Sequence, residues 1–249
     1  MNRANPEIHV AITAAPREGP PLLERCVGSL SAGGFTGGEI AIFAEPELAI
    51  ASWVRGSCDV TQHPQRLGEY RNHVFAWARS IERTADFILS VEEDTVFCRR
   101  LREFCIALIR RWPAGCGAIH LYTSRFYRHQ PRGLSVLSRD EAYDMKAACA
   151  ILFPRDVLAE VVRYAREVGW RGHFRKTIRE PVAQVGTDTF IGESLTWLGY
   201  EIRVLRPSLA EHVADYSASG HGGSGGCRCA VEFIGADADP FDAYPSLRP

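Results

Sequence analysis

The 249-residue sequence predicts an α/β fold, in which a mostly parallel sheet is flanked by helices in a single domain. Two observations predict it. Short apolar runs of strand length alternate along the chain with segments whose apolar residues recur at helical spacing. Several of these runs are uniformly apolar, which is typical of strands that are buried on both faces. Because 46% of the residues are hydrophobic, a domain of this length can bury a substantial core.

The first half of the chain contains three predicted strands and two predicted helices. "EIHVAITAAP" (7–16) is rich in β-branched residues and ends in proline, which predicts a strand. "PPLLERCVGSLSAGG" (20–34) has prolines at its start and glycines at its end, as a helix does. "EIAIFAEP" (39–46) is a second strand, and residues 68–83 have the apolar face of a helix. "DFILSV" (86–91) is predicted to be the central strand.

The second half continues the alternation and ends in an irregular segment. Further helices are predicted at 101–112, 155–169 and 187–199, and further strands in "GAIHLYT" (117–123), "AACAILFP" (147–154) and "YEIRVLRP" (200–207). From Ser217 onward the sequence is rich in glycine and serine and loses its periodicity. We therefore predict one domain over residues 1–216 and a mostly irregular tail over residues 217–249.

Composition argues against several classes of partner. The formal net charge of −1 gives no overall field that would favour nucleic acid or an anionic membrane. No apolar run approaches the ~18 uncharged residues that a membrane-spanning helix needs, and no signal-peptide pattern is expected at the N-terminus. Six of the eight cysteines are isolated, and Cys227 and Cys229 are expected to be a pair of thiols rather than a zinc site. These features predict a reducing, cytoplasmic location.

Three consecutive carboxylates, Glu92, Glu93 and Asp94, follow the predicted central strand directly. In α/β sheets, ligands bind beyond the carboxyl ends of the strands. Three carboxylates at such a place repel one another and lose hydration unless a cation or hydrogen-bond donors compensate them. The residues by themselves leave two interpretations open, a solvated acidic turn and a site for a metal ion and a phosphate.

The order of several motifs resembles the GT-A-fold glycosyltransferases, which are enzymes that use nucleotide sugars. The resemblance covers about residues 7 to 216. Its features are a nucleotide-binding first strand (Ile8 to Ala15), "LGEYRNHVFAWA" (67–78), an acidic motif of the D-x-D type (Glu92-Glu93-Asp94), "GTDTF" with Asp188, and His212 in "PSLAEHV". The motif departs from the family pattern in having Glu92 at its first position. A short segment, "PSLAEHVADYSASG", is also similar to N-acetylglucosaminyltransferase IV-type enzymes.

The resemblance implies a divalent metal, which neutralises the diphosphate leaving group. Asp94 and His212 are then the metal ligands, and Glu92 and Glu93 contact ribose hydroxyls or water on the metal. Hard oxygen ligands suit Mg²⁺ or Mn²⁺, and a histidine shifts the preference toward Mn²⁺. The alternative for His212 is an ordinary surface or capping histidine.

Asp188 is the catalytic base that the resemblance implies, and its alternative role is to cap the helix that begins there. Arg71 and Asn72, at the start of a predicted helix, are expected to contact the base, ribose or phosphate, unless they form only a solvated first turn. Two basic and aromatic loops, 124–133 and 169–181, suit a sugar and a diphosphate, or a lid without direct contact.

The sequence therefore predicts a metal-dependent glycosyltransferase that moves a sugar from a nucleotide donor, with UDP favoured by the resemblance, to a hydroxyl acceptor. Inversion at the anomeric carbon is expected, with Asp188 as the base and Glu193 as the reserve candidate. Two alternatives belong to other classes: a non-catalytic nucleotide-sugar or carbohydrate-binding module, and a nucleotidyltransferase. The latter usually has a glycine-rich basic loop after its first strand, whereas "TAAPREGPP" has few glycines.

Overall fold

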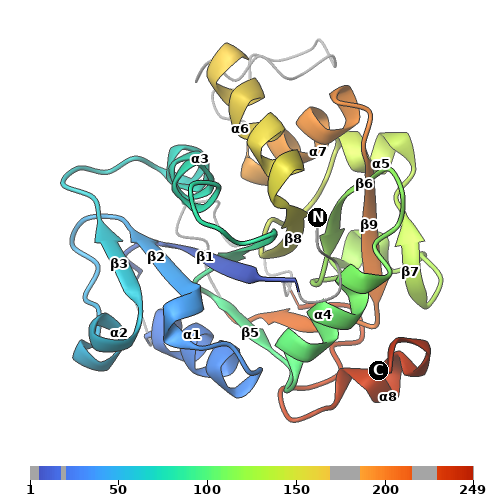
Figure 1. Cartoon of the computed structure of the whole chain (residues 1–249), viewed down its shortest axis with the longest axis horizontal. Coiled ribbons are helices and arrows are strands. Elements are labelled where there is room, and N and C mark those ends of the chain that lie inside the picture. The colour runs from blue at the N-terminus through green and yellow to red at the C-terminus, as the bar shows by residue number, and fades with distance from the viewer. Residues whose placement is uncertain (1–5, 18–20, 169–185, 215–228, 249) are drawn as a thin grey trace.

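An eight-stranded sheet in the order β3-β2-β1-β4-β8-β6-β9-β7 forms the centre of the structure (Figure 1). This computed structural model describes residues 6–17, 21–168, 186–214 and 229–248. The strands are β1 (Ile8–Ala14), β2 (Ile40–Ala44), β3 (Asp59–Gln62), β4 (Phe87–Glu92), β5 (Thr95–Phe97), β6 (Cys116–His120), β7 (Gly133–Val136), β8 (Ala150–Pro154), β9 (Glu201–Arg206) and β10 (Ala210–His212). The helices are α1 (Leu22–Ala32), α2 (Ser52–Ser57), α3 (Glu69–Ser80), α4 (Leu101–Arg110), α5 (Arg139–Tyr143), α6 (Arg155–Val168), α7 (Thr187–Trp197) and α8 (Pro240–Ala243).

The predicted α/β class is confirmed, and so is each predicted strand and helix. Pairing is parallel from β3 through β2 and β1 to β4, and again between β6 and β9. Strand β8 runs antiparallel to both β4 and β6, and β7 runs antiparallel to β9. The start of β8 therefore lies beside the carboxyl end of β4, where Ala150 pairs with Val91.

Two hydrophobic cores cover the two faces of the sheet. Side chains alternate between the faces along a strand, so Val10 and Ile12 of β1 enter one core and Ala11 enters the other. The first core contains buried residues of α1, α2, α4 and α8, and the second contains those of α3, α5, α6 and α7. Figure 1 shows the same division, with these two groups of helices on opposite sides of the sheet. None of the described helices is long and apolar enough to cross a membrane.

A two-stranded antiparallel ribbon of β5 and β10 is the feature that shapes the site most directly. Its register pairs Thr95 with His212 and Phe97 with Ala210. The backbone N–H of Val213 continues the pairing by donating to the carbonyl of Asp94 at 2.8 Å. The ribbon therefore holds the segment after β9 against the residues that follow β4.

The described C-terminal stretch, residues 229–248, packs on the domain. The ring of Phe241 is buried, and its centroid lies 5.6 Å from that of Phe104 on α4. Tyr244 packs on the same ring and donates its hydroxyl hydrogen bond to the carbonyl of Pro207. Cys229 is disulfide-bonded, which corrects the expectation of a free thiol at this position, and Cys227 lies outside the described residues. The predicted boundary at residue 216 stays a prediction, and this packing supports treating residues 229–248 as part of the folded unit.

Phe241→Ala should lower the free energy of unfolding by about 3 kcal/mol, because it leaves a cavity in a core that α4 and α8 share. Urea unfolding of the full chain measures the change. Phe126→Ala is the matched control, since the Phe126 ring is 55% exposed and its loss should cost less than about 0.5 kcal/mol. Equal effects in the two variants would show that the C-terminal stretch does not stabilise the domain.

Candidate functional site

The acidic triplet lies at the carboxyl end of β4, as the sequence predicted. Glu92 is the last residue of the strand, and Glu93 and Asp94 form the turn to β5. Both turn residues are buried. His212, on β10, lies beside them, with its Nε2 atom 2.9 Å from Asp94 Oδ2. The structure thus brings together the two predicted metal ligands, which are 118 positions apart in the sequence.

Arg17 supplies the charge that compensates this cluster. It follows β1, the neighbour of β4, and its Nε atom lies 2.7 Å from Glu93 Oε1. Its Nη2 atom lies 2.8 Å from Asp94 Oδ2. One guanidinium group therefore bridges two buried carboxylates, which suits the fixed fork of donors that arginine presents.

The three carboxylates have different proton affinities because their partners differ. Burial, and then the charges of Asp94 and the other acidic neighbours, raises the pKa of Glu92 well above its ordinary value. Burial and the charge of Asp94 raise the pKa of Glu93 to about 7, although Arg17 opposes the rise. Burial also acts to raise the pKa of Asp94, but His212 and Arg17 outweigh it and lower that pKa below its ordinary value. Asp94 is therefore the member of the triplet that is firmly ionised at neutral pH.

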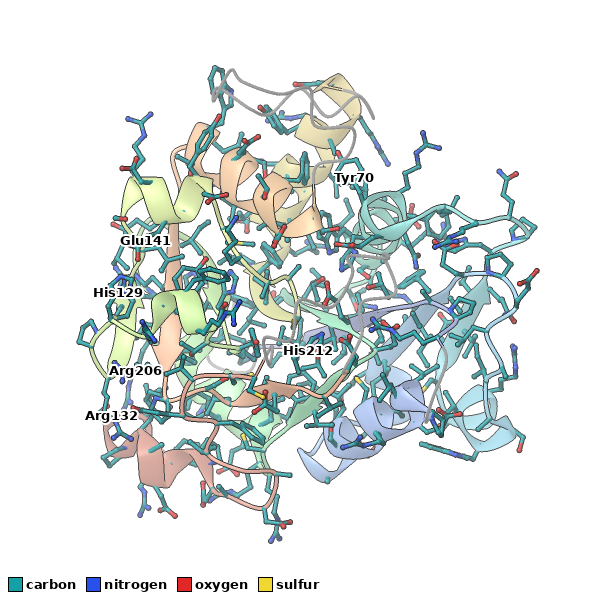
Figure 2. The ribbon with its side chains drawn as sticks, turned by 180° about the vertical axis from the view of Figure 1, so that it is seen from behind. Tyr70, His129, Arg132, Glu141, Arg206 and His212 are labelled. Carbon is teal, nitrogen blue, oxygen red and sulfur yellow. The ribbon has the colours of Figure 1, made fainter. Side chains whose placement is uncertain are left out.

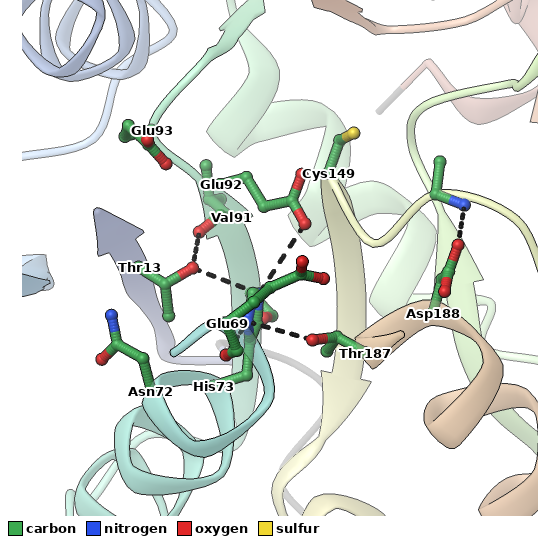
Figure 3. A network of polar contacts seen from close by, with 12 residues as sticks. Thr13, Glu69, Asn72, His73, Val91, Glu92, Glu93, Cys149, Thr187 and Asp188 are labelled. Atoms are coloured by element: carbon green, nitrogen blue, oxygen red, sulfur yellow. Dashed lines mark hydrogen bonds and ion pairs between the residues drawn. The ribbon is translucent and has the colours of Figure 1, made fainter. Parts of the chain in front are cut away.

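His73 of α3 connects the helix to the strand ends (Figure 3). Its Nδ1 atom lies 3.0 Å from the carbonyl of Glu69, and its Nε2 atom lies 3.1 Å from Thr13 Oγ1. Because a carbonyl only accepts, Nδ1 carries the proton, and the unprotonated Nε2 faces the Thr13 hydroxyl, which also lies 3.4 Å from the carbonyl of Val91. Burial lowers the pKa of His73, which keeps the ring neutral. Nε2 also lies 4.0 Å from Glu92 Oε1, so the ring forms one wall of the acidic cluster.

Arg71 and Asn72, which were predicted to contact the nucleotide, lie on different sides of α3. The Asn72 amide is buried, donates to the carbonyl of Phe43 at 3.0 Å, and has its oxygen 2.9 Å from His63 Nε2. These contacts fasten α3 to the end of β2. Arg71 is exposed. The structure therefore does not bring this pair together as one binding element.

Asp188 lies in the first turn of α7, where both of its oxygens accept backbone hydrogen bonds. Ala147 N–H donates to Oδ2 at 3.0 Å, and Thr189 N–H donates to Oδ1 at 2.7 Å. Ala147 has a positive φ of 71°, a conformation that is uncommon for alanine. Burial raises the pKa of Asp188 despite the two amides, and the charge of Glu69 adds to the rise. Asp188 combines the predicted capping role with the raised proton affinity that suits a base.

Glu193, the reserve candidate for the base, is directed elsewhere. It is buried on α7, and its charge adds to the effect of burial in raising the pKa values of Tyr143 and Tyr164. These tyrosines belong to α5 and α6. Glu193 therefore faces the packing between helices rather than the end of β4.

The first basic loop, residues 124–133, is fixed to the domain at the side of the molecule. Tyr127 is buried and its hydroxyl accepts from Lys146 N–H at 2.8 Å, and His129 is paired with Glu141 at 2.7 Å. Figure 2 shows His129 near the edge of the molecule, whereas His212 is in the middle. Four side chains of the loop line a surface hollow: Arg125, Phe126, Arg128 and His129. The second loop, 169–181, lies outside the described residues.

The atoms around His212 fit a divalent cation. Asp94 Oδ1 and His212 Nδ1 are buried and have no hydrogen-bond partner among the described residues. A carboxylate oxygen of Glu92, the Sγ atom of Cys149 and a ring nitrogen of His212 lie within 4.8 Å of one another. Oxygen, nitrogen and sulfur donors in one buried cluster are the ligands that divalent transition metals take. The described residues thus provide a place where a cation would satisfy polar atoms that otherwise remain unpaired.

Comparison with known proteins bears on the fold. No protein-family profile and no curated protein matches the sequence. The crystal structure of S. aureus TarS, residues 1–349, matches 81% of this chain and 59% of that one, with a TM-score of 0.53 and 9% identity. The mannosyltransferase PcManGT from Pyrobaculum calidifontis, in complex with GDP-Man and Mn²⁺, matches 82% of this chain and 55% of that one, with a TM-score of 0.49 and 13% identity. The fold is GT-A-like. At such low identity the likeness concerns the fold alone, and the chain spans less than 60% of each of these two structures.

Four residues at this end of the GT-A-like sheet were not predicted to take part: Arg17, Glu69, His73 and Cys149. A signal for Arg17 is present in the sequence, because it follows the first strand as the triplet follows the central one. Glu69 and His73 have the i, i+4 spacing that places them on one face of a helix. Cys149 precedes an apolar run, and no local pattern distinguishes it from a core cysteine.

Arg17→Gln should lower the free energy of unfolding by about 3 kcal/mol, because Glu93 and Asp94 lose the cation that compensates them in a buried setting. Urea unfolding at neutral pH measures it. Arg79→Gln is the control, since both partners of its ion pair with Glu82 are mostly exposed and its loss should cost less than about 1 kcal/mol. A loss no larger than that of the control would mean that Arg17 does not stabilise the cluster.

Proposed function

We propose that the protein is a metal-dependent glycosyltransferase that moves a sugar from a nucleotide-diphosphate donor to a hydroxyl acceptor. The contact between Asp94 and His212 carries the proposal, because each side chain keeps one buried polar atom without a partner in the described structure. The contact lies at the carboxyl end of β4, which is the edge of a GT-A-like sheet where a ligand is expected. UDP-sugars are favoured as donors by the family resemblance of the sequence. The similarity to N-acetylglucosaminyltransferase IV-type enzymes stays a prediction.

The cation is proposed to bind at Asp94 and His212, with Mn²⁺ preferred over Mg²⁺ because of the imidazole. When bound, it would stabilise the charge that develops on the departing diphosphate. Arg17 holds Glu93 and Asp94 in place from the β1 side. Glu92 is less buried than its two neighbours and is proposed to contact a ribose hydroxyl or a water molecule on the cation.

The residues of α3 are proposed to act in two ways. Arg71 is exposed at the start of the helix and would contact the nucleotide base, ribose or phosphate. Asn72 uses its amide within the protein, so its contribution to nucleotide binding would be to hold α3 against β2. His73, neutral and buried, lies beside Glu92, with its Nε2 atom 4.0 Å from Glu92 Oε1.

Asp188 is proposed to be the general base for the acceptor hydroxyl. In a single in-line displacement, the acceptor oxygen attacks the anomeric carbon opposite the diphosphate, which inverts that carbon. The hydroxyl loses its proton as the new bond forms, and a carboxylate on the attacking side accepts it. Asp188 comes from α7, away from the triplet, and its pKa is raised by burial. The two backbone N–H groups fix the orientation of the carboxylate.

Asp94→Asn should weaken Mn²⁺-dependent binding of UDP at least about 10-fold, because the amide keeps the shape of the side chain but removes its negative charge. Isothermal calorimetry with UDP, with and without Mn²⁺, measures the effect. Asp86→Asn is the matched control, because Asp86 lies just before the opposite end of β4 and accepts from Glu7 N–H. Unchanged affinity in Asp94→Asn would remove Asp94 from the metal site.

Asp188→Asn should reduce turnover by about 10² or more, the usual contribution of a general base, while donor affinity stays unchanged. Asp156→Asn is the matched control: Asp156 is also the second residue of its helix, and it accepts from Val157 N–H at 2.9 Å. NMR of the product linkage establishes the stereochemistry. Retention of configuration, or near-normal turnover, would leave Asp188 as a helix cap only.

The same assays separate the proposal from its two alternatives. A binding module of this fold would bind the nucleotide sugar with Mn²⁺ but release neither sugar product nor nucleotide diphosphate. A nucleotidyltransferase would release pyrophosphate from a nucleotide triphosphate. Transfer of a sugar to a hydroxyl acceptor, with release of the nucleotide diphosphate, is the result expected of the glycosyltransferase.

A further inference from the structure

A cysteine lies among the atoms that would surround the cation. The Sγ atom of Cys149, a carboxylate oxygen of Glu92 and a ring nitrogen of His212 lie within 4.8 Å of one another. Figure 3 shows the Cys149 and Glu92 side chains next to each other at the ends of their strands. The family pattern in the sequence gave this cysteine no role.

Backbone pairing fixes this arrangement. The N–H of Glu92 donates to the carbonyl of Cys149 at 3.0 Å, and the hydroxyl of Thr95 donates to the same carbonyl at 3.2 Å. Thr95 in turn is the partner of His212 in the ribbon of β5 and β10. Hydrogen bonds to the backbone therefore join the end of β4, the start of β8 and the ribbon of β5 and β10. The side chains of these three segments converge without any movement of a loop.

The His212 ring has the orientation of a metal-binding histidine, with one ring nitrogen on a carboxylate and the other without a partner among the described residues. Its Nε2 atom lies 2.9 Å from Asp94 Oδ2, whereas its Nδ1 atom is buried and has no hydrogen-bond partner among the described residues. The His212 side chain is only 2% exposed. A histidine that ligates a metal usually donates its other N–H to a carboxylate, which fixes the ring and its tautomer. The Asp94 contact leaves Nδ1 as the nitrogen available to a cation.

We propose that Cys149 is a ligand of the cation, in a set that combines its thiolate with the Glu92 carboxylate and the His212 imidazole. In this set Glu92 and Cys149 replace Asp94 as direct ligands, and Asp94 acts on the cation through the imidazole that it orients. The proposal deepens the proposed function, because it concerns the metal of the same site. The thiol proton passes to solvent as the bond between sulfur and metal forms, and a proton held by the Glu92 carboxyl group is lost in the same way, so cation binding releases protons. Diphosphate oxygens and water complete the coordination.

The ligand set predicts which cations the protein selects. Thiolate and imidazole favour Zn²⁺ and Co²⁺, whereas Mg²⁺ takes oxygen ligands in a nearly ideal octahedron. The protein should therefore bind Zn²⁺ and Co²⁺ more tightly than Mn²⁺, and Mg²⁺ most weakly. A site built only from the acidic triplet would show much less preference between Mn²⁺ and Zn²⁺.

Titration of the full-length protein with Co²⁺ tests the ligand directly, because a bond between thiolate and Co²⁺ gives a near-ultraviolet charge-transfer band. We expect the band in the unmodified protein and in Cys105→Ser, a control in which another buried free cysteine, on α4, is replaced. We expect no band in Cys149→Ser, together with at least about 10-fold weaker Zn²⁺ binding in competition with a chelator. His212→Ala should lose the band as well, which gives a second variant if Cys149→Ser does not fold.

The outcomes separate this proposal from the proposed function. Binding of Co²⁺ without the band, or a band that persists in Cys149→Ser, would overturn the assignment of Cys149. Sugar transfer by such a protein would leave the glycosyltransferase proposal standing. A Cys149-dependent band in a protein that transfers no sugar would support the metal site and overturn the activity.

Discussion

The crowding of three adjacent carboxylates at the end of β4, of which Glu93 and Asp94 are buried and Glu92 is partly buried, is the constraint on which the rest of this site depends. Isolated buried carboxylates are costly, so each must find a cation, a hydrogen-bond donor or a proton. Arg17 and His212 keep Asp94 ionised, while Glu92 and Glu93 have raised pKa values. The cluster is thus only partly compensated by the protein itself. A divalent cation would complete the compensation, which links the energetics of the fold to the proposed chemistry.

The sheet places the two halves of the proposed reaction on different elements. The parallel strands β1 and β4 end at the acidic cluster, and the antiparallel β8 begins beside it. The segment between α5 and β8 meets the start of α7, where Ala147 holds Asp188. The proposed metal ligands therefore lie at strand ends and on the β5–β10 ribbon, whereas the proposed base for the acceptor hydroxyl lies at the start of α7. His73 lies between them, within reach of both Glu92 and Thr187.

Prediction from the sequence succeeded where the signal was local. The long strands and helices were predicted because each has its own periodicity or apolar run. The short elements were missed, since a few residues carry too little pattern to define a strand or a helix; they are β3, β5, β7, β10, α2, α5 and α8. On α3 the local pattern predicted the helix but not which of its side chains face the strands. Arg71 and Asn72 were chosen for their side-chain chemistry, yet the rotation of the helix exposes the first, buries the second and directs their neighbour His73 to the cluster.

The sequence by itself determined the α/β class and the place of the acidic triplet at the end of a buried strand, because both follow from local apolar patterns. It also supplied Asp94, Asp188 and His212 as candidates through the order of the motifs. Tertiary structure decided which residues meet. Strand order places Arg17 beside Glu93, the antiparallel direction of β8 brings Cys149 to Glu92, and the register of β5 with β10 sets His212 against Asp94. These contacts join segments far apart in the chain, and only backbone pairing across the sheet specifies them.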